Sequence, residues 1–210
     1  EYDAARIYAE HRRWSQLHAE PLAARIQPHA NDRSLDRRLR IGYVSPDFRA
    51  HPVGAFLLPL LESHNHEDFE IFCYSSVRVP DAITDRCRAH AEIWRSVGNA
   101  SDEQVADKVR RDRIDILVDL TMHMADNRLL AFARKPALIQ VTYLAYCGTT
   151  GLSTMDYRLT DPDLDPLGRD EQDVIESGSS APNSARLAHD EWQNAERLHT
   201  ASSNSPRFNG

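Results

Sequence analysis

The sequence has few cysteines, no long apolar run and no excess of positive charge. Its three cysteines, Cys73, Cys87 and Cys147, are widely spaced, which argues against a disulfide framework and against zinc-finger spacings. No apolar stretch approaches the ~20 residues that a membrane span requires, and the first residues do not resemble a signal peptide. These absences lead us to expect a cytoplasmic protein without a membrane partner.

The charge balance excludes another class of partner. The formal net charge is -7 and the sequence pI is ≈ 5.8, so nucleic acid is not expected to bind. The basic residues are scattered, and the single run at residues 110–113 is typical of the solvated end of a helix. A length of 210 residues suits one domain with attached segments.

The chain is organised around an apolar run, a polar turn and an amphipathic segment. Residues 39–45 are predicted to form a strand, which a proline and an aspartate end because proline cannot donate to a ladder and aspartate favours turns. Apolar residues spaced by three and four predict a helix over 53–64, with Pro52 where a first helical residue would stand. His51 therefore lies beyond the carboxyl end of a strand, where α/β enzymes place ligand-binding groups.

Strands and helices alternate in the following part of the chain. Strands are predicted over residues 69–75, 93–97, 114–120, 138–144 and 157–160, and helices over 81–90, 101–111 and 127–134. This alternation, with nearly continuous apolar runs in the central strands, indicates a parallel sheet covered by helices on both faces. The predicted fold class is therefore α/β, with a Rossmann-like doubly wound parallel sheet whose strand-to-helix loops share one edge.

Composition divides the chain into regions. Residues 1–38 are predicted to hold a helix over 3–18 and a polar linker over 21–38, residues 39–168 the α/β lobe, and residues 169–210 a polar tail, poorly ordered or loosely packed, with at most one helix over 184–200.

Two histidines are the candidate catalytic residues. A histidine at a helix N-terminus feels the positive end of the helix dipole, which favours a neutral imidazole able to accept a proton or bind a hydroxyl. His51 has this setting, and the alternative is that it caps or packs its own loop. His123 follows strand 114–120, and it faces the same crevice as His51 if the two strands are neighbours; otherwise it is a hydrogen-bonded loop residue. No third residue at a suitable spacing completes a metal site with them.

The loop at residues 148–151 is a third candidate. Its threonines and glycines suit binding of a sugar or phosphate, and a turn that needs glycine explains them equally well. No G-x-G-x-x-G follows the first strand, which argues against a dinucleotide-binding fold. The sequence also has no P-loop and no nucleophile elbow.

Several motifs follow one another in an order typical of one family. They lie at residues 11–14, 40–48 with His51 and Pro52, 69–75, 115–120 with His123, 133–142, 148–151 and 155–161. In these residues the chain resembles the O-linked N-acetylglucosamine transferase family, which includes the Spindly-type O-fucosyltransferases of plants. The resemblance covers residues 5–168.

The resemblance implies a two-lobed glycosyltransferase of the GT-B type, of which this chain matches the first catalytic lobe. It implies tetratricopeptide repeats upstream and an inverting transfer of a sugar from a nucleotide donor to a Ser or Thr hydroxyl, without metal or cofactor. The expected donor is UDP-N-acetylglucosamine (UDP-GlcNAc), with GDP-fucose as the alternative. The expected acceptors are proteins.

The resemblance also implies roles for individual residues. His51 matches the active-site histidine of the family, and His123 matches a second histidine of the same cleft. Donor or acceptor binding is expected at Pro52, Thr149, Thr150 and Gly151.

The chain departs from the family in ways that affect activity. Methionines flank His123 where the family more often has Gly and Thr. The second lobe, which supplies most nucleotide contacts and an essential lysine in the family, is not present, and the tail after Gly168 does not resemble the family. We therefore expect a poor or inactive transferase when the chain is alone. The alternative is a non-catalytic α/β module that only binds a partner.

Overall fold

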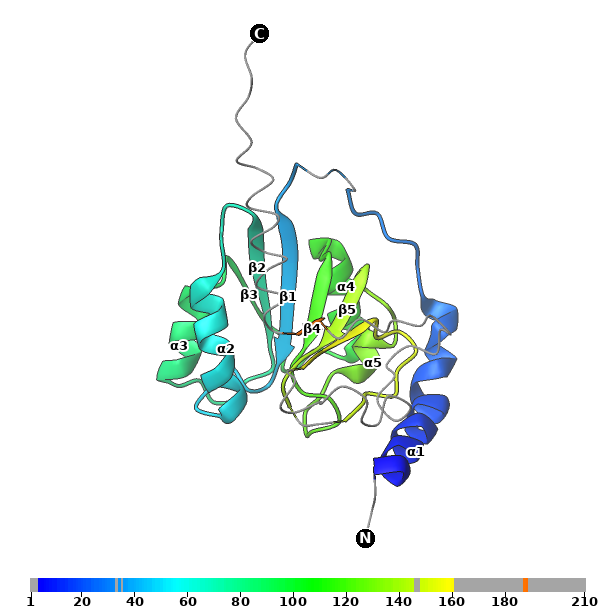
Figure 1. The fold of residues 1–210 in the computed structure, drawn as a ribbon. Coiled ribbons are helices and arrows are strands. Elements are labelled where there is room, and N and C mark those ends of the chain that lie inside the picture. The colour runs from blue at the N-terminus through cyan, green and yellow to red at the C-terminus, as the bar shows by residue number, and fades with distance from the viewer. Residues whose placement is uncertain (1–3, 33, 35, 146–147, 161–186, 189–210) are drawn as a thin grey trace.

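The structure is a computed structural model that describes residues 4–32, 34, 36–145, 148–160 and 187–188 (Figure 1). Among these residues, strands form one parallel sheet in the order β3-β2-β1-β4-β5-β6-β7. The strands are β1 (Leu39–Ser45), β2 (Phe69–Ser75), β3 (Ile93–Ser96), β4 (Ile116–Asp119), β5 (Ile139–Thr142), β6 (Tyr157–Thr160) and β7 (Leu187–Ala188).

Helices cover both faces of this sheet. They are α1 (Ala4–Trp14), continued by a π-helical turn (Ser15–Ala19) and a 3₁₀ segment (Glu20–Arg25), α2 (Pro52–Ser63), α3 (Ala82–Ala89), α4 (Asp102–Asp112) and α5 (Leu129–Phe132). Helices α2 and α3 pack on one face, and α4, α5 and the end of the N-terminal helical segment on the other (Figure 1).

The point where the strand order reverses lies between β1 and β4. The chain passes from β1 to β2 and β3 on one side, and β4, β5 and β6 then extend the sheet on the other side. Ile41 of β1 pairs with Ile71 of β2 and with Ile116 of β4. The predicted doubly wound, Rossmann-like sheet is confirmed, and its reversal point is where such folds bind ligands.

Each face of the sheet has its own apolar core. Ile41 and Leu57 are fully buried in the core beneath α2, and Leu117 and Val109 are at most 1% exposed in the core beneath α4. Burial of a Leu, Ile or Val side chain stabilises a fold by about 1.5–3 kcal/mol. Successive side chains along a strand point to opposite faces of the sheet, so the same strands pack against the helices on both faces.

Reciprocal capping boxes begin two of the helices. Ser101 accepts a hydrogen bond from the Gln104 amide while the Gln104 side chain accepts one from the Ser101 amide, so α4 begins with a capping box. Asp81 and Thr84 form the same reciprocal arrangement at the start of α3.

The structure corrects several element boundaries. The linker expected from Pro21 begins after Arg25, because Pro21 lies at the start of the 3₁₀ segment, where a missing N–H group costs little. The helix expected over 127–134 is limited to α5. Phe56, which the sequence places on the apolar stripe of α2, is 68% exposed.

The polar tail is described only at Leu187–Ala188. These residues pair in parallel with Leu159 and Thr160 of β6, so the helix expected over 184–200 is wrong at this point. The other residues of the expected tail after residue 168 lie outside the described part of the chain, as does Cys147.

Candidate active site

The loop after β1 is tightly held and presents His51. Ser45 Oγ accepts a hydrogen bond from the Asp47 amide at 2.9 Å, and Asp81 Oδ2 accepts one from the Ala50 amide at 2.7 Å. Gly54 lies so close to this loop that a Cβ there would be 2.2 Å from the Arg49 carbonyl oxygen. The first turn of α2 therefore needs glycine to pack against the loop that ends at His51.

His51 is the N-cap residue of α2. Its Nδ1 accepts a hydrogen bond from the Val53 amide at 3.2 Å, and its side chain is 28% exposed. A neutral imidazole that accepts at Nδ1 carries its proton on Nε2, so this nitrogen is a hydrogen-bond donor. Asp47 Oδ2 lies 3.7 Å from Nδ1 and favours the opposite tautomer, in which Nε2 becomes an acceptor.

His51 lines a cavity of about 600 Å³ at the carboxyl ends of the strands. This His51 cavity lies between the loops that follow β1, β2 and β4. Its other lining residues are Pro46, Asp47, Arg49, Ser76, Arg78, Val79, Asp81, Met124, Ala125 and Asp126. The volume suits a small organic ligand. Pro52 is exposed next to His51 and is not among the lining residues.

His123 has a different environment on the same edge. Its ring stacks on His11 of α1 with centroids 4.1 Å apart, and it meets the Trp14 ring edge-on at 4.9 Å. Its Nε2 donates a hydrogen bond to the Thr150 carbonyl oxygen at 2.8 Å. Burial lowers the pKa of His123 to about 4, so the ring is neutral near pH 7.

A buried carboxylate shapes the loop that carries His123. Asp119, at the end of β4, accepts hydrogen bonds from the amides of Thr121 and Met122 and from the Thr142 hydroxyl at 2.9–3.2 Å. Met122 adopts a positive φ of 48°, and the hydrogen bonds from the Thr121 and Met122 amides to Asp119 stabilise this conformation. Complete burial raises the pKa of Asp119 to about 6 despite these bonds.

The loop expected to bind donor or acceptor is buried against α1. Thr149 and Thr150 are at most 1% exposed, and Thr149 Oγ1 accepts a hydrogen bond from the Gly151 amide at 3.0 Å. Gly151 has φ +69°, and a Cβ there would be 2.8 Å from the His11 carbonyl oxygen. Arg12 donates to the Gly151 carbonyl oxygen at 2.8 Å. The loop thus supplies a glycine-dependent turn that supports α1.

The sequence-predicted residues therefore fall into two groups. β1 and β4 are neighbours as expected, yet His123 is not among the residues that line the His51 cavity. His123 instead joins His11, Trp14, Thr150 and Gly151 in a packed group, which we call the His123 cluster. Sequence reasoning missed the roles of His11, Trp14 and Asp119. The sequence feature that could have indicated a role for His11 is its position on the apolar face of α1.

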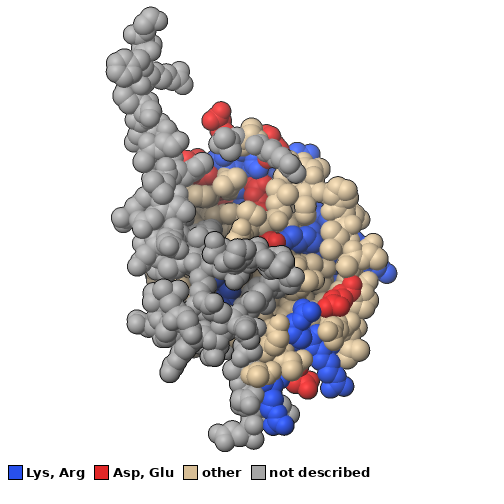
Figure 2. All heavy atoms as spheres, turned by 45° about the vertical axis from the view of Figure 1, so that its right-hand side comes forward, with Lys and Arg blue, Asp and Glu red and all other residues tan. Residues whose placement is uncertain are grey.

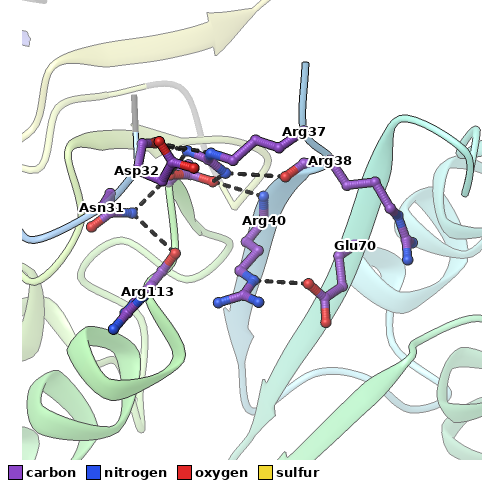
Figure 3. Close-up of a pocket in the computed structure, with 8 residues that line it drawn as sticks. Asn31, Asp32, Arg37, Arg38, Arg40, Glu70 and Arg113 are labelled. Carbon is purple, nitrogen blue, oxygen red and sulfur yellow. Dashed lines mark hydrogen bonds and ion pairs between the residues drawn. The ribbon is translucent and has the colours of Figure 1, made fainter. Parts of the chain in front are cut away.

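A second cavity lies at the opposite edge of the sheet, where the strands begin (Figure 3). Arg37 there makes a double ion pair with Asp115, with both N–O distances 2.7 Å, and Asn31 also donates to this carboxylate. Burial favours a raised pKa for Asp115, but the hydrogen bonds from Arg37, the Arg40 amide and Asn31 outweigh it and lower the pKa. This network fastens the segment before β1 to the sheet.

No large field of one charge sign is visible on the face drawn in Figure 2. Lys and Arg side chains lie among Asp and Glu side chains on the face drawn in Figure 2. In the described part of the chain, no group of three or more His, Cys, Asp or Glu residues is arranged to hold a metal ion. Within the same residues, no helix is both long and apolar enough to cross a membrane.

Comparison with known proteins decides the family. The family model described as Glycosyl transferase family 41 matches residues 12–176. The chain belongs to glycosyltransferase family 41. The predicted resemblance to O-linked N-acetylglucosamine transferases is thereby confirmed.

Two plant relatives and one solved structure illustrate the match to family 41. The "probable UDP-N-acetylglucosamine--peptide N-acetylglucosaminyltransferase SPINDLY" of Oryza sativa subsp. japonica is 38% identical over 175 residues, which cover 81% of this chain and 19% of that protein. The corresponding SEC protein of Arabidopsis thaliana is 38% identical over 132 residues, which cover 62% of this chain and 14% of that protein. A lysine-to-methionine mutant of the Thermobaculum terrenum O-GlcNAc transferase has a TM-score of 0.78 and 44% identity, over 84% of this chain and 34% of that one. The chain thus spans about a fifth of the length of the SPINDLY relative.

Proposed function

We propose that this chain is the first catalytic lobe of a protein O-glycosyltransferase, with GlcNAc as the transferred sugar and UDP-GlcNAc as the donor. The observation that carries the proposal is the His51 cavity, which places a helix-capping histidine at the reversal point of a family 41 sheet. Relatives named as UDP-GlcNAc-dependent peptide glycosyltransferases support the choice of donor and acceptor. GDP-fucose is the alternative donor.

In the proposed reaction the acceptor Ser or Thr oxygen attacks the anomeric carbon while the bond to UDP breaks, and the hydroxyl proton leaves to a base. With Nδ1 bonded to the Val53 amide, His51 donates from Nε2 and orients an acceptor or sugar oxygen. His51 takes the proton only if its own proton moves to Nδ1, toward Asp47. A substitution at Asp47 therefore tests whether His51 orients the acceptor or acts as the base.

The proposed roles of the other predicted residues follow from their positions. Pro52 fixes the start of α2 beside the cavity, and Thr149, Thr150 and Gly151 act by holding the His123 cluster in place. The second lobe of the GT-B architecture, upstream tetratricopeptide repeats and a cytoplasmic location are part of the same proposal. Because the chain spans a minor part of its relatives, we propose that it is inactive alone.

The test is a transfer assay in two formats. The chain alone is incubated with labelled UDP-GlcNAc or GDP-fucose and an acceptor protein, and we expect no turnover. A chimera in which residues 12–160 replace the matching part of the Thermobaculum terrenum enzyme is expected to transfer GlcNAc. An inactive chimera that folds would contradict the proposal and favour the non-catalytic binding module.

Variants of the chimera then test His51. Replacement of His51 by Ala is expected to lower kcat at least tenfold, whereas His66→Ala, a change at an exposed histidine outside the cavity, leaves kcat unchanged. Asp47→Asn removes the carboxylate near Nδ1. If His51 only orients the acceptor, this change alters kcat little. If His51 is the base, kcat falls and the acidic limb of the profile of kcat against pH shifts.

A further inference from the structure

A larger cavity adjoins the His51 cavity on the side toward the edge strand β3. This α4 groove has a volume of about 820 Å³ and lies between α4 and the ends of β2 and β3. Ser76 and Arg78 line both the α4 groove and the His51 cavity. The two cavities therefore adjoin each other at Ser76 and Arg78.

The α4 groove is rich in hydrogen-bond donors and positive charge. Arg78, Lys108 and Arg111 line it, and Asp107 is the one acidic residue among its lining residues. In the described part of the chain, neither Lys108 nor Arg111 makes an ion pair with a carboxylate. Cations that line a concave surface without a carboxylate partner attract an anionic ligand.

Hydrogen bonds of Arg128 hold the wall of the groove together. Arg128, whose side chain is 14% exposed, donates to the carbonyl oxygens of Ala100 and Val97 at 2.9 Å and to Ser76 Oγ at 3.2 Å. These bonds tie the loop after β3 to the loop before α5. The groove is thus preformed, which lowers the entropic cost of binding.

Arg78 stands at the junction of the two hollows. It pairs with Asp126 at 2.6 Å, and the two side chains are 78% and 47% exposed. An exposed pair of this kind is weak, so Arg78 is able to exchange Asp126 for a carboxylate on a ligand. A ligand that occupied both cavities would lie against Arg78.

We propose that the α4 groove is a subsite for an acidic residue of the acceptor polypeptide. The proposal rests on the proposed function, because it takes the reacting hydroxyl to lie at His51. β1 and β3 are separated by two strand spacings of ~4.8 Å, a span that an extended peptide covers in about three residues at ~3.3 Å each. The subsite therefore favours Asp or Glu about three residues from the modified Ser or Thr.

The test measures binding of a peptide pair to the 210-residue chain by calorimetry. Each extended peptide contains one Ser. The residues three positions before and three positions after this Ser are Asp in the first peptide and Asn in the second. We expect the Asp peptide to bind about 3- to 10-fold more tightly at low salt, with a smaller ratio at high salt. Equal binding, or no binding of either peptide, would overturn the proposal.

Variants identify the groove as the source of the preference. Lys108→Gln combined with Arg111→Gln, and separately Arg78→Gln, are expected to reduce the Asp-over-Asn ratio toward one. Arg86→Gln is the matched control, because Arg86 is an exposed arginine paired with Glu62 on another part of the surface. Thermal unfolding is recorded for each variant, and the Arg78→Gln result decides the question if the double variant does not fold.

Two further measurements separate the possible causes of failure. Inorganic phosphate is the second probe: if it binds and the Asp peptide shows no preference, the groove is a general anion site and the proposal is wrong. The chimera is also assayed with both peptides. Equal turnover of the two peptides would refute the subsite alone, whereas no turnover with either peptide would refute the proposed function.

Discussion

Two histidines on the same edge of the sheet have opposite environments. His51 borders an open cavity of about 600 Å³ and makes its hydrogen bond to the first turn of its own helix. His123 is packed between His11, Trp14 and the Thr150 carbonyl, and burial lowers its pKa to about 4. A shared edge therefore does not give a shared role, because packing by α1 decides which side chain reaches solvent.

The largest effect is expected from Gly151→Ala. The new Cβ would lie 2.8 Å from the His11 carbonyl oxygen, at a residue with φ +69°. Strain and overpacking are expected to lower the free energy of unfolding by about 3 kcal/mol. Chemical unfolding measures the loss. Gly98→Ala is the control, since its nearest contact would be at 3.8 Å, and equal effects of the two changes would show that α1 does not dock on this loop.

A smaller loss is expected from Asp119→Asn. An amide oxygen replaces only one of the two carboxylate oxygens that accept from the Thr121 and Met122 amides, so one buried donor loses its partner. We expect a loss of about 2 kcal/mol in the free energy of unfolding. Asp126→Asn, in the exposed part of the same loop, is the matched change and is expected to cost less than half as much. Similar losses for both would refute the positioning role of Asp119.

The open histidine is expected to contribute less to stability. His51→Ala removes the side-chain cap of α2 and should lower the free energy of unfolding by about 1 kcal/mol. Asn is a good N-cap residue, so His51→Asn should restore the stability while leaving turnover of the chimera low. Recovery of turnover by Asn would mean that His51 acts only as a cap.

The smallest effect near neutral pH is the protonation of His123. The unfolded state binds this proton with a pKa near 6.5 and the folded state with one of about 4, so His123 makes the fold less stable as pH falls from 6.5 toward 4. Asp119 has a folded pKa of about 6 against 3.8 when unfolded, so it makes the fold more stable as pH falls from 6 toward 3.8. Proton NMR of the His123 ring is therefore the measurement, and a midpoint near 6.5 would show that the His123 cluster is open in solution.

Sequence patterns predicted the fold well because they act locally. The apolar runs of β1, β2 and β6 gave their observed bounds. Boundaries were less predictable where tertiary contacts compete with periodicity, as at Pro21 and in the short α5. The order of motifs along the chain is enough to indicate the family from the sequence alone.

The opening strand, turn and helix by themselves determined that His51 would lie at the start of α2, at the carboxyl edge of a parallel sheet. Only the tertiary structure decided that His123 would turn toward α1 and that the threonines of residues 149–150 would be buried. The reason is physical: a cap depends on residues two or three positions away. Burial of a loop side chain depends instead on an element more than a hundred residues distant, here His11 and Arg12 against Gly151.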